Sequence, residues 1–490
     1  MIRKSSFFTV LIYLIVGLSG GEAQQQKNIV FILSDDHRYD FMSFHPESPD
    51  FLETPVMDRM AEEGAHLANA FVTTSLCSPS RMSILTGQYP FRHSVVDNHN
   101  IMPEGTNLVS TAMQEAGYQT GYFGKWHIGN DHDDPKPGFD RWVSFQGQGV
   151  YYNPTLNVDG QRDDYEGYIT DILTDYTIDW LDSIDHDQPF FAYLSHKAVH
   201  AEFEPAQRHE GEYAESYIPT PESMKYIESN YDGKPDWVKA QRFSWHGVDY
   251  MYHNRSDHPQ GIQDLIIRYT ETLLGVDESI GRVMDYLEEN GLAENTIVIY
   301  MGDNGFMLGE HGLIDKRNAY EASMRVPLLA WAPGTIEPGS VIEENVLNID
   351  MPLTFLDIAG GSMPADHVTD GASFLQLLEG ETVPDWRPTF VYQYFWEHSF
   401  PHTPTTYAIR DNRYKLIYYH GLWDQNELYD LQTDPHETYN LINVPEHQER
   451  AQRMRAEMFE IFEDNEATDV RFRPPSLFQA DEKKIHIKQY

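Results

Sequence analysis

NIVFILSDDH, residues 28–37, starts as a short apolar run rich in β-branched residues and ends in two carboxylates. Such a run is typical of a strand buried on both faces. A second run of this kind, TIVIYMGDNG at 296–305, follows a segment, 264–290, whose apolar residues recur at helical spacing. Helix followed by strand predicts an α/β domain with a large, mainly parallel sheet sandwiched by helices.

Acidic side chains follow both predicted strands. Ligands of such sheets bind outside the carboxyl ends of the strands, so we expect the side chains there to meet. Their oxygen atoms are hard ligands that suit Ca²⁺ or Mg²⁺ and do not suit a metal that prefers thiolates. An Asp-Asp pair at a strand end is also a common cap or turn, and that alternative stays open. The candidate ligands are Asp35, Asp36, Asp303 and Asn304.

The single cysteine of the chain lies in CSPSR, residues 77–81. It has no partner for a disulfide within the chain, so its role is reactivity or packing as a small apolar residue. Pro79 after Ser78 is typical of a first helical position after a cap, which places Cys77 just ahead of a helix N-terminus that favours anions. Arg81 follows about one turn later and can point at the same anion.

Three further blocks combine cationic and imidazole side chains with turn residues. They are GKWHIG at 124–129 after a predicted strand at 118–123, HKAVH at 196–200 after the apolar run 190–194, and GEHGLIDKR at 309–317. Glycines let the backbone approach a ligand closely, and lysine and histidine can hold it. For GKWHIG, the alternative is a salt-bridged lysine and a core histidine, which this block alone would favour.

The cysteine block, continued by Leu85-Thr86-Gly87, and the other blocks in this order resemble the formylglycine-dependent (type I) sulfatases of the alkaline phosphatase-like superfamily, including bacterial polysaccharide and glycosaminoglycan sulfatases. The resemblance extends over residues 28–440. It implies that a formylglycine-generating enzyme oxidises Cys77 to formylglycine (3-oxoalanine). It also implies one divalent cation, Ca²⁺ rather than Mg²⁺, on the four oxygen ligands and modified Cys77. Val199 departs from the proline that is usual in the family.

The resemblance also implies a mechanism. Arg81, Lys125 and Lys316 would neutralise the sulfate together with the metal. One hydroxyl of hydrated formylglycine attacks sulfur, His200 or Lys316 protonates the leaving oxygen, and His127 removes the proton of the second hydroxyl so that sulfate is expelled. For sugar contacts we predict five side chains: His311, Arg317, His398, His402 and Arg410.

The N-terminus and the overall charge bear on location and partners. Residues 1–23 are built like a secretory signal peptide, with Arg3 and Lys4 ahead of an apolar run too short to span a bilayer. We therefore expect an exported protein, periplasmic or secreted. With 35 basic and 77 acidic side chains, the formal charge is −42. Such a surface repels nucleic acid and anionic membranes, so neither is an expected partner, and a sulfated glycan needs a locally basic pocket.

The remaining chain divides into two parts. Residues 24–385 are the predicted catalytic domain, with a loop-rich insertion at 201–261 that is either the substrate rim or surface decoration. Residues 386–490 are a smaller α+β subdomain, with strands near 390–395, 407–410, 415–419 and 427–431 and a helix near 445–463.

We therefore predict a sulfatase that acts on a sulfated polysaccharide or its oligosaccharides. Export and acidity favour a marine algal substrate such as ulvan or carrageenan, with glycosaminoglycans also open. The alternatives are a phosphodiesterase or phosphonate monoester hydrolase of the same superfamily, which a second metal would favour, and a glycan-binding protein that has kept an inactive sulfatase fold.

Overall fold

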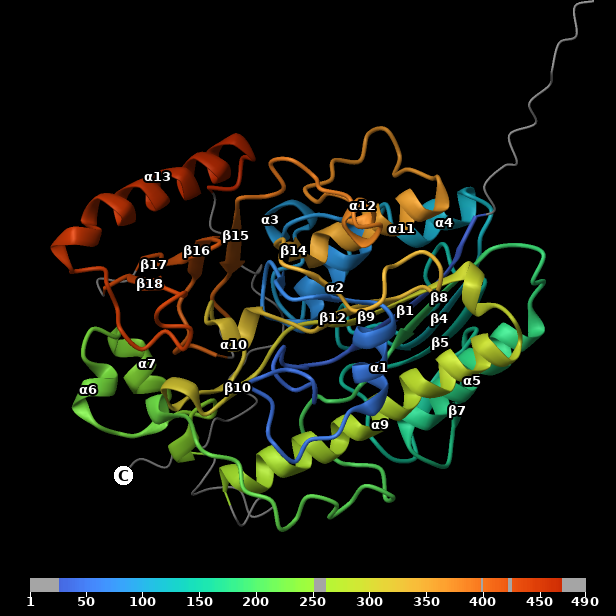
Figure 1. Cartoon of the computed structure of the whole chain (residues 1–490), viewed down its shortest axis with the longest axis horizontal. Coiled ribbons are helices and arrows are strands. Elements are labelled where there is room, and N and C mark those ends of the chain that lie inside the picture. The colour runs from blue at the N-terminus through green and yellow to red at the C-terminus, as the bar shows by residue number, and fades with distance from the viewer. Residues whose placement is uncertain (1–25, 251–260, 398–399, 422–424, 469–490) are drawn as a thin grey trace, which may run out of the picture.

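The computed structural model describes residues 26–250, 261–397, 400–421 and 425–468, and a ten-stranded sheet forms its centre (Figure 1). The central strands β9, β1, β8, β4 and β5 are all parallel, whereas β12, β6 and β7 join antiparallel at the two sides. The predicted mainly parallel sheet is confirmed. In spatial order the strands are β13 (Ser340–Ile342), β2 (Ala65–Leu67), β12 (Leu328–Trp331), β9 (Thr296–Gly302), β1 (Asn28–Ser34), β8 (Phe190–Ser195), β4 (Gln119–Lys125), β5 (Arg141–Phe145), β6 (Thr155–Val158) and β7 (Gln161–Asp164).

Strand β1 is buried on both faces, as its uninterrupted apolar sequence predicts. Successive side chains of a strand point to opposite faces. Ile29, Phe31 and Leu33 pack into one core, and Val30 and Ile32 pack into the other. The first core includes helices α2 (Cys77–Thr86), α4 (Val109–Glu115) and α11 (Met351–Ala359); the second includes α1 (Pro55–Glu63), α5 (Ile169–Ser183) and α9 (Ile262–Glu289). The sheet is therefore sandwiched by helices (Figure 1).

The C-terminal part is a four-stranded antiparallel sheet with one long helix, as predicted. Its strands are β15 (Thr389–Tyr394), β16 (Thr406–Asp411), β17 (Tyr414–Tyr419) and β18 (Glu427–Asp430), and the helix is α13 (Gln448–Asp464). Met458 and Phe462 of α13 are buried against the sheet. The rings of Phe71 and Phe390 lie 5.0 Å apart, so the small sheet shares the core of the α2 face.

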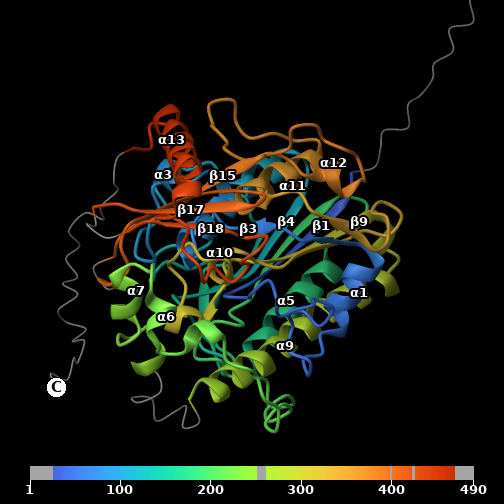
Figure 2. The same ribbon diagram turned by 60° about the vertical axis from the view of Figure 1, so that its left-hand side comes forward.

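The segment predicted as an insertion consists of loops and short helices in its described residues, 201–250. These are η1 (Glu222–Met224), α6 (Glu228–Tyr231) and α7 (Asp236–Gln241). Figure 2 shows α6 and α7 below the C-terminal sheet. Trp237 of α7 contacts the ring of Tyr419 at 5.7 Å, and Thr403 donates a hydrogen bond to Gln241 at 3.0 Å. The insertion is thus anchored to the C-terminal part.

None of the helices that the structure describes is both long and apolar enough for a membrane span. The predicted signal peptide, 1–23, lies outside the described residues.

Short elements connect the layers of the fold. They are β3 (Ala70–Phe71), α3 (Pro90–His93), η2 (Ala293–Asn295), β10 (Met307–Leu308), η3 (Glu310–Gly312), β11 (Ile314–Asp315), α10 (Glu321–Met324), β14 (Val346–Leu347), η4 (Asn348–Asp350), α12 (Leu375–Leu378) and η5 (Pro445–His447).

Candidate active site

The register of the central strands brings the predicted oxygen ligands together. Ser34 at the end of β1 pairs with Gly302 at the end of β9, so the residues that follow the two strands are neighbours. The Asp36 backbone donates to Asp303 Oδ1 at 3.1 Å, and Asn304 Nδ2 donates to Asp36 Oδ1 at 2.6 Å. One oxygen from each of Asp35, Asp36 and Asp303 lies within 4.8 Å of the other two, and all three residues are buried.

These four side chains fit a hard divalent cation. Asn304 Oδ1 is buried and accepts no hydrogen bond from the described residues. Burial and the adjacent Asp35 and Asp303 carboxylates, against the opposing effect of Lys316, together raise the pKa of Asp36 to about 7. A cation among these oxygens would relieve the repulsion between the carboxylates and use the free amide oxygen.

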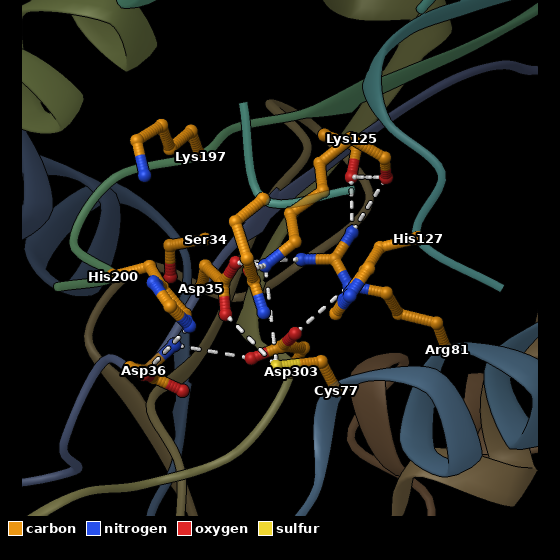
Figure 3. A network of polar contacts seen from close by, with 12 residues as sticks. Ser34, Asp35, Asp36, Cys77, Arg81, Lys125, His127, Lys197, His200 and Asp303 are labelled. Carbon is orange, nitrogen blue, oxygen red and sulfur yellow. Dashed lines mark hydrogen bonds and ion pairs between the residues drawn. The ribbon is translucent and has the colours of Figure 1, made fainter. Parts of the chain in front are cut away.

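Cys77 is the first residue of helix α2, with Leu76 at the N-cap. This corrects the expectation that Ser78 caps the helix, because the Ser78 hydroxyl instead donates to the carbonyl of His127. The Sγ atom lies 2.9 Å from Lys316 Nζ, 3.6 Å from Asp35 Oδ1 and 4.0 Å from Lys125 Nζ. Figure 3 shows Cys77 beside Asp303 and facing Asp35. The cysteine thus lies where the acidic and the basic side chains meet.

Three buried cations surround Cys77. Arg81, one turn further along α2, donates through Nε to Asp303 at 2.9 Å and through Nη1 to Ser195 Oγ at 2.6 Å. Lys125, the last residue of β4, forms an ion pair with Asp35, and Lys316 forms one with Asp36. The cluster thus contains three cations and three carboxylates.

Of the two predicted catalytic histidines, His127 is buried and His200 is half-buried, and both are neutral. His127 Nε2 lies 3.2 Å from Asn130 Oδ1, while its Nδ1 is buried and has no hydrogen-bond partner among the described residues. His200 Nδ1 bonds to the carbonyl of Ala201, and its Nε2 lies 3.9 Å from Asp36 Oδ2. Burial, reinforced by Lys125, holds the pKa of both imidazoles well below the usual value. Each ring therefore has one nitrogen available as a proton acceptor.

The five predicted sugar contacts differ in their positions. One lies close to the site, two are packing residues, one is exposed and one lies outside the described residues. Arg317 is adjacent to Lys316 and pairs with Asp315 and Glu397. His402 is exposed, and His398 lies outside the described residues.

His311 and Arg410 are corrections to the prediction. His311 is buried with its ring 4.5 Å from that of Tyr320. Arg410 is buried in an ion pair with Glu321 and lies 4.3 Å from the ring of Phe71. Both side chains are enclosed by packing contacts. Residue type alone does not reveal exposure in a short helix such as η3 or in an inner strand such as β16.

Several site residues were not predicted. Gln148 accepts a hydrogen bond from Lys125 Nζ, Asn130 holds His127, and Ser195 accepts from Arg81. Lys197 is buried, 4.5 Å from the ring centre of Tyr151, and burial lowers its pKa to about 8. Ser195 is the last residue of β8, so the expectation that ligands bind at the carboxyl ends of the strands could have found it. Gln148 lies in a loop, where the sequence carries no such signal.

A parallel sheet with a cation site at its strand ends, beside a helix-initial cysteine ringed by cations, defines a hydrolase of anionic esters with the alkaline phosphatase-like fold. The family model described as Sulfatase matches residues 27–362, and one described as N-sulphoglucosamine sulphohydrolase, C-terminal, matches residues 309–464. The chain therefore belongs to the sulfatase family and is a sulfuric ester hydrolase.

Individual relatives agree with this family. The chain is 32% identical to an N-acetylglucosamine-6-O-sulfatase of Bacteroides thetaiotaomicron, over 94% of this chain and 90% of the relative. It superposes with a TM-score of 0.83 and 31% identity on BT4656 in complex with its substrate D-glucosamine-2-N,6-O-disulfate, covering 91% of this chain and 99% of the other. A phosphonate monoester hydrolase of Agrobacterium radiobacter shares the fold, with a TM-score of 0.74, 21% identity and coverage of 89% and 96%.

Proposed function

We propose that this enzyme hydrolyses the 6-O-sulfate ester of glucosamine residues in a glycosaminoglycan or its oligosaccharides. One observation carries the proposal: a relative named as an N-acetylglucosamine-6-O-sulfatase and a solved complex with a glucosamine disulfate are each above 30% identical to this chain, and each match covers about nine-tenths or more of both chains. The cluster around Cys77 supplies the three cations that a sulfate ester needs.

Ulvan and carrageenan rank second as substrates. The algal prediction rested on acidity and export, neither of which identifies a sugar, and it stays a prediction. The predicted export, to the periplasm or outside the cell, fits both substrates because a polymer must be met outside the cytoplasm. The predicted signal peptide is the basis for this location.

The nucleophile that we propose is formylglycine made from Cys77 by a maturation enzyme. Once hydrated, the aldehyde offers one hydroxyl that attacks sulfur and passes its proton to Asp303. Deprotonation of the second hydroxyl then re-forms the aldehyde and expels sulfate, and a thiol has no such second hydroxyl. A divalent cation, with Ca²⁺ favoured over Mg²⁺, would be held by Asp35, Asp36, Asp303 and Asn304 and would supply positive charge to the sulfate oxygens.

The cationic side chains are arranged to neutralise the sulfate. Arg81 and Lys125 are fixed by Asp303 and Asp35 and cannot turn away from Cys77. Preorganised charge in a site without water contributes more to catalysis than the same charge in water. Lys316, at 2.9 Å from Sγ, is close enough to contact both the sulfate and the leaving oxygen.

The hydrogen bonds of the histidines separate their roles. The Nδ1–H of His200 donates to the carbonyl of Ala201, which leaves Nε2 as an acceptor. Lys316 carries protons that it can donate, and its Nζ lies 2.9 Å from Sγ, the position of the nucleophile. We therefore assign protonation of the leaving oxygen to Lys316 rather than His200. His127 donates through Nε2–H to Asn130, so its buried Nδ1 is the base that accepts the proton of the second hydroxyl.

A substrate panel tests this proposal. The protein, coexpressed with a formylglycine-generating enzyme, is incubated with N-acetylglucosamine-6-sulfate, N-acetylgalactosamine-6-sulfate, ulvan and carrageenan oligosaccharides and a phosphonate monoester. We expect sulfate release from the glucosamine sulfate at a kcat/KM at least tenfold above every other substrate. Preferred release from an algal oligosaccharide would overturn the sugar assignment, and faster hydrolysis of the phosphonate would overturn the choice of sulfate.

A further inference from the structure

The insertion carries an unusual concentration of exposed aromatic side chains. Among the described residues, seven aromatic side chains are strongly exposed, and four of these lie between residues 217 and 245. Tyr226 and Phe243 are each 54% exposed, and Trp245 is 58% exposed. Scattered exposed apolar residues need no explanation, but a group of them on one segment marks an interaction surface.

These aromatic rings are arranged in advance of any ligand. The ring centres of Tyr226 and Phe243 lie 5.6 Å apart at 81°, and Trp245 lies 5.5 Å from Tyr250. The guanidinium of Arg242 lies 5.3 Å from the centre of Tyr226 and is itself fixed by Asp249. Ordering these rings therefore costs little on binding.

The same segment is joined to the loop that carries Lys316. The backbone of Ile314 donates to the carbonyl of His246 at 2.9 Å, and Gly247 forms a β-bridge with Leu313. His246 Nδ1 also pairs with Asp315 Oδ2 at 2.9 Å. Trp245 is the residue before His246. Lys316 is two residues after Ile314, so the Cα atoms of Ile314 and Lys316 are at most about 7 Å apart. The segment that carries Phe243 and Trp245 is thus joined by hydrogen bonds and an ion pair to the loop that carries Lys316.

We propose that Tyr226, Phe243 and Trp245 form an auxiliary surface that binds the sugar units of the glycan beyond the one whose sulfate is cleaved. This inference rests on the proposed function, because it needs a glycan substrate. Aromatic faces stack on the apolar faces of pyranose rings, while Tyr and Trp keep a polar group for hydroxyls.

A nearby cation suits a sulfated chain rather than a neutral one. Lys239 is exposed, and its Nζ lies 5.6 Å from the ring centre of Tyr226. The chain has a net charge of −42, which repels polyanions in general. A cation beside the exposed aromatic rings reduces this repulsion locally. The expected occupant is a sulfated oligosaccharide of two or more sugars that continues from the active site.

The test compares a short with a long substrate. The matured protein and its Trp245→Ala and Phe243→Ala variants are assayed with N-acetylglucosamine-6-sulfate and with a heparin-derived tetrasaccharide whose terminal glucosamine is 6-sulfated. We expect KM for the tetrasaccharide to rise about tenfold in each variant, the factor that about 1.4 kcal/mol of lost binding gives. Values for the monosaccharide should not change, and Trp245→Phe should restore most of the tetrasaccharide affinity.

Val341→Ala is the matched control, since Val341 is 62% exposed on β13, the strand at one edge of the central sheet. It should leave both substrates unaffected. Unchanged tetrasaccharide kinetics in Trp245→Ala and Phe243→Ala would overturn the inference, and so would an equal loss on the monosaccharide. Concentration-dependent dimerisation that the variants abolish would identify a second copy of the chain as the occupant instead. If the wild type hydrolyses neither sugar, the proposed function fails, and binding of the tetrasaccharide to Cys77→Ala by calorimetry tests the surface separately.

Discussion

Two buried clusters of this protein carry the same charges and behave differently. The reactive cluster consists of Asp35, Asp36, Asp303, Arg81, Lys125 and Lys316. The closed cluster lies between the insertion and the C-terminal sheet and consists of Glu321, Glu427, Glu437, Lys234, Lys415 and Arg410. Each contains three carboxylates and three cations, all buried.

The difference lies in how completely their polar atoms are paired. In the closed cluster Glu427 accepts hydrogen bonds from the hydroxyls of Tyr320, Tyr419 and Tyr429, and Lys234 donates to Tyr429 and to the carbonyl of Glu437. Around the reactive cluster, Asn304 Oδ1 and His127 Nδ1 are buried without hydrogen-bond partners among the described residues, and Arg81 Nη2 has only an ion pair with Asp35 at 3.6 Å. In the closed cluster Glu437 Oε1 likewise accepts no hydrogen bond, but Lys415 Nζ lies 2.6 Å from it.

This contrast shows that burial of charge does not by itself mark a functional site. A fully paired network stabilises one arrangement of the chain, whereas unpaired buried atoms cost free energy that a ligand can recover. The closed cluster therefore fixes the insertion to the C-terminal sheet, and the reactive cluster is arranged for an ion and a substrate. Matched substitutions in the two clusters should separate stability from activity.

The largest expected effect is that of Lys316→Met on catalysis. Loss of this cation removes both the charge opposite the sulfate and the proton donor, so kcat/KM should fall by about 10³-fold or more. The melting temperature should change less than in the equivalent variant of the closed cluster. Steady-state sulfate release and thermal unfolding measure the two effects, and activity within tenfold of the wild type would remove Lys316 from the mechanism.

Lys234→Met should lower the stability of the protein and leave its activity nearly unchanged, the opposite of Lys316→Met. Removing one partner leaves Glu427 buried and uncompensated, which should lower the free energy of unfolding by about 3–5 kcal/mol. Denaturant unfolding measures this loss. The kcat of the folded fraction should stay close to the wild-type value on N-acetylglucosamine-6-sulfate. A stable variant with lost activity would mean that the closed cluster takes part in catalysis.

Removal of divalent cations should affect only the reactive cluster. A cation that binds the native state at a hundred times its Kd stabilises it by about 2.7 kcal/mol, so a chelator should lower the melting temperature and abolish activity. Addition of Ca²⁺ or Mg²⁺ should restore both and reveal the preference. Asn304→Ala should weaken this restoration, and melting that is insensitive to chelator in the wild type would contradict the cation site.

A smaller effect concerns Asp277, a buried carboxylate that belongs to neither cluster. It accepts hydrogen bonds from the backbone N–H groups of Val56 and Met57 at the start of α1. Burial raises its pKa to about 7, so the native state keeps a proton that the unfolded state has lost. Stability contributed by this group is therefore present at pH 4 and declines as the pH rises to 7.

Asp277→Asn should flatten this decline. A rise of about three pKa units corresponds to about 4 kcal/mol, so we expect a difference of at most about 4 kcal/mol between pH 4 and pH 7. Denaturant unfolding of wild type and variant at both values gives the difference. A constant difference at all pH values would show that Asp277 is ionised throughout.

The sequence predicted those parts of the site that local rules determine. Asp35 and Asp303 follow buried strands, and parallel strands place their carboxyl ends at one edge. Arg81 lies one helical turn after Cys77, so both face the same ligand. The fold class and the C-terminal sheet followed from the same periodicities.

The remainder depends on packing between distant segments. Gln148 reaches Lys125 from a loop, and Arg410 is enclosed by Glu321 and Phe71, which only the folded chain brings together. The closed cluster was also missed, because Lys234 and Glu427 are 193 residues apart. The predicted algal substrate rested on overall charge, which describes a surface and does not identify a sugar.

The most direct test of the account is sulfate release from N-acetylglucosamine-6-sulfate by the matured protein and by Cys77→Ala, with the mass of residue 77 determined in the same wild-type sample. We predict that residue 77 has the mass of formylglycine, that the wild type releases sulfate, and that Cys77→Ala is folded and inactive. Equal release by Cys77→Ala, or release by a protein in which residue 77 is entirely unmodified cysteine, would contradict the account.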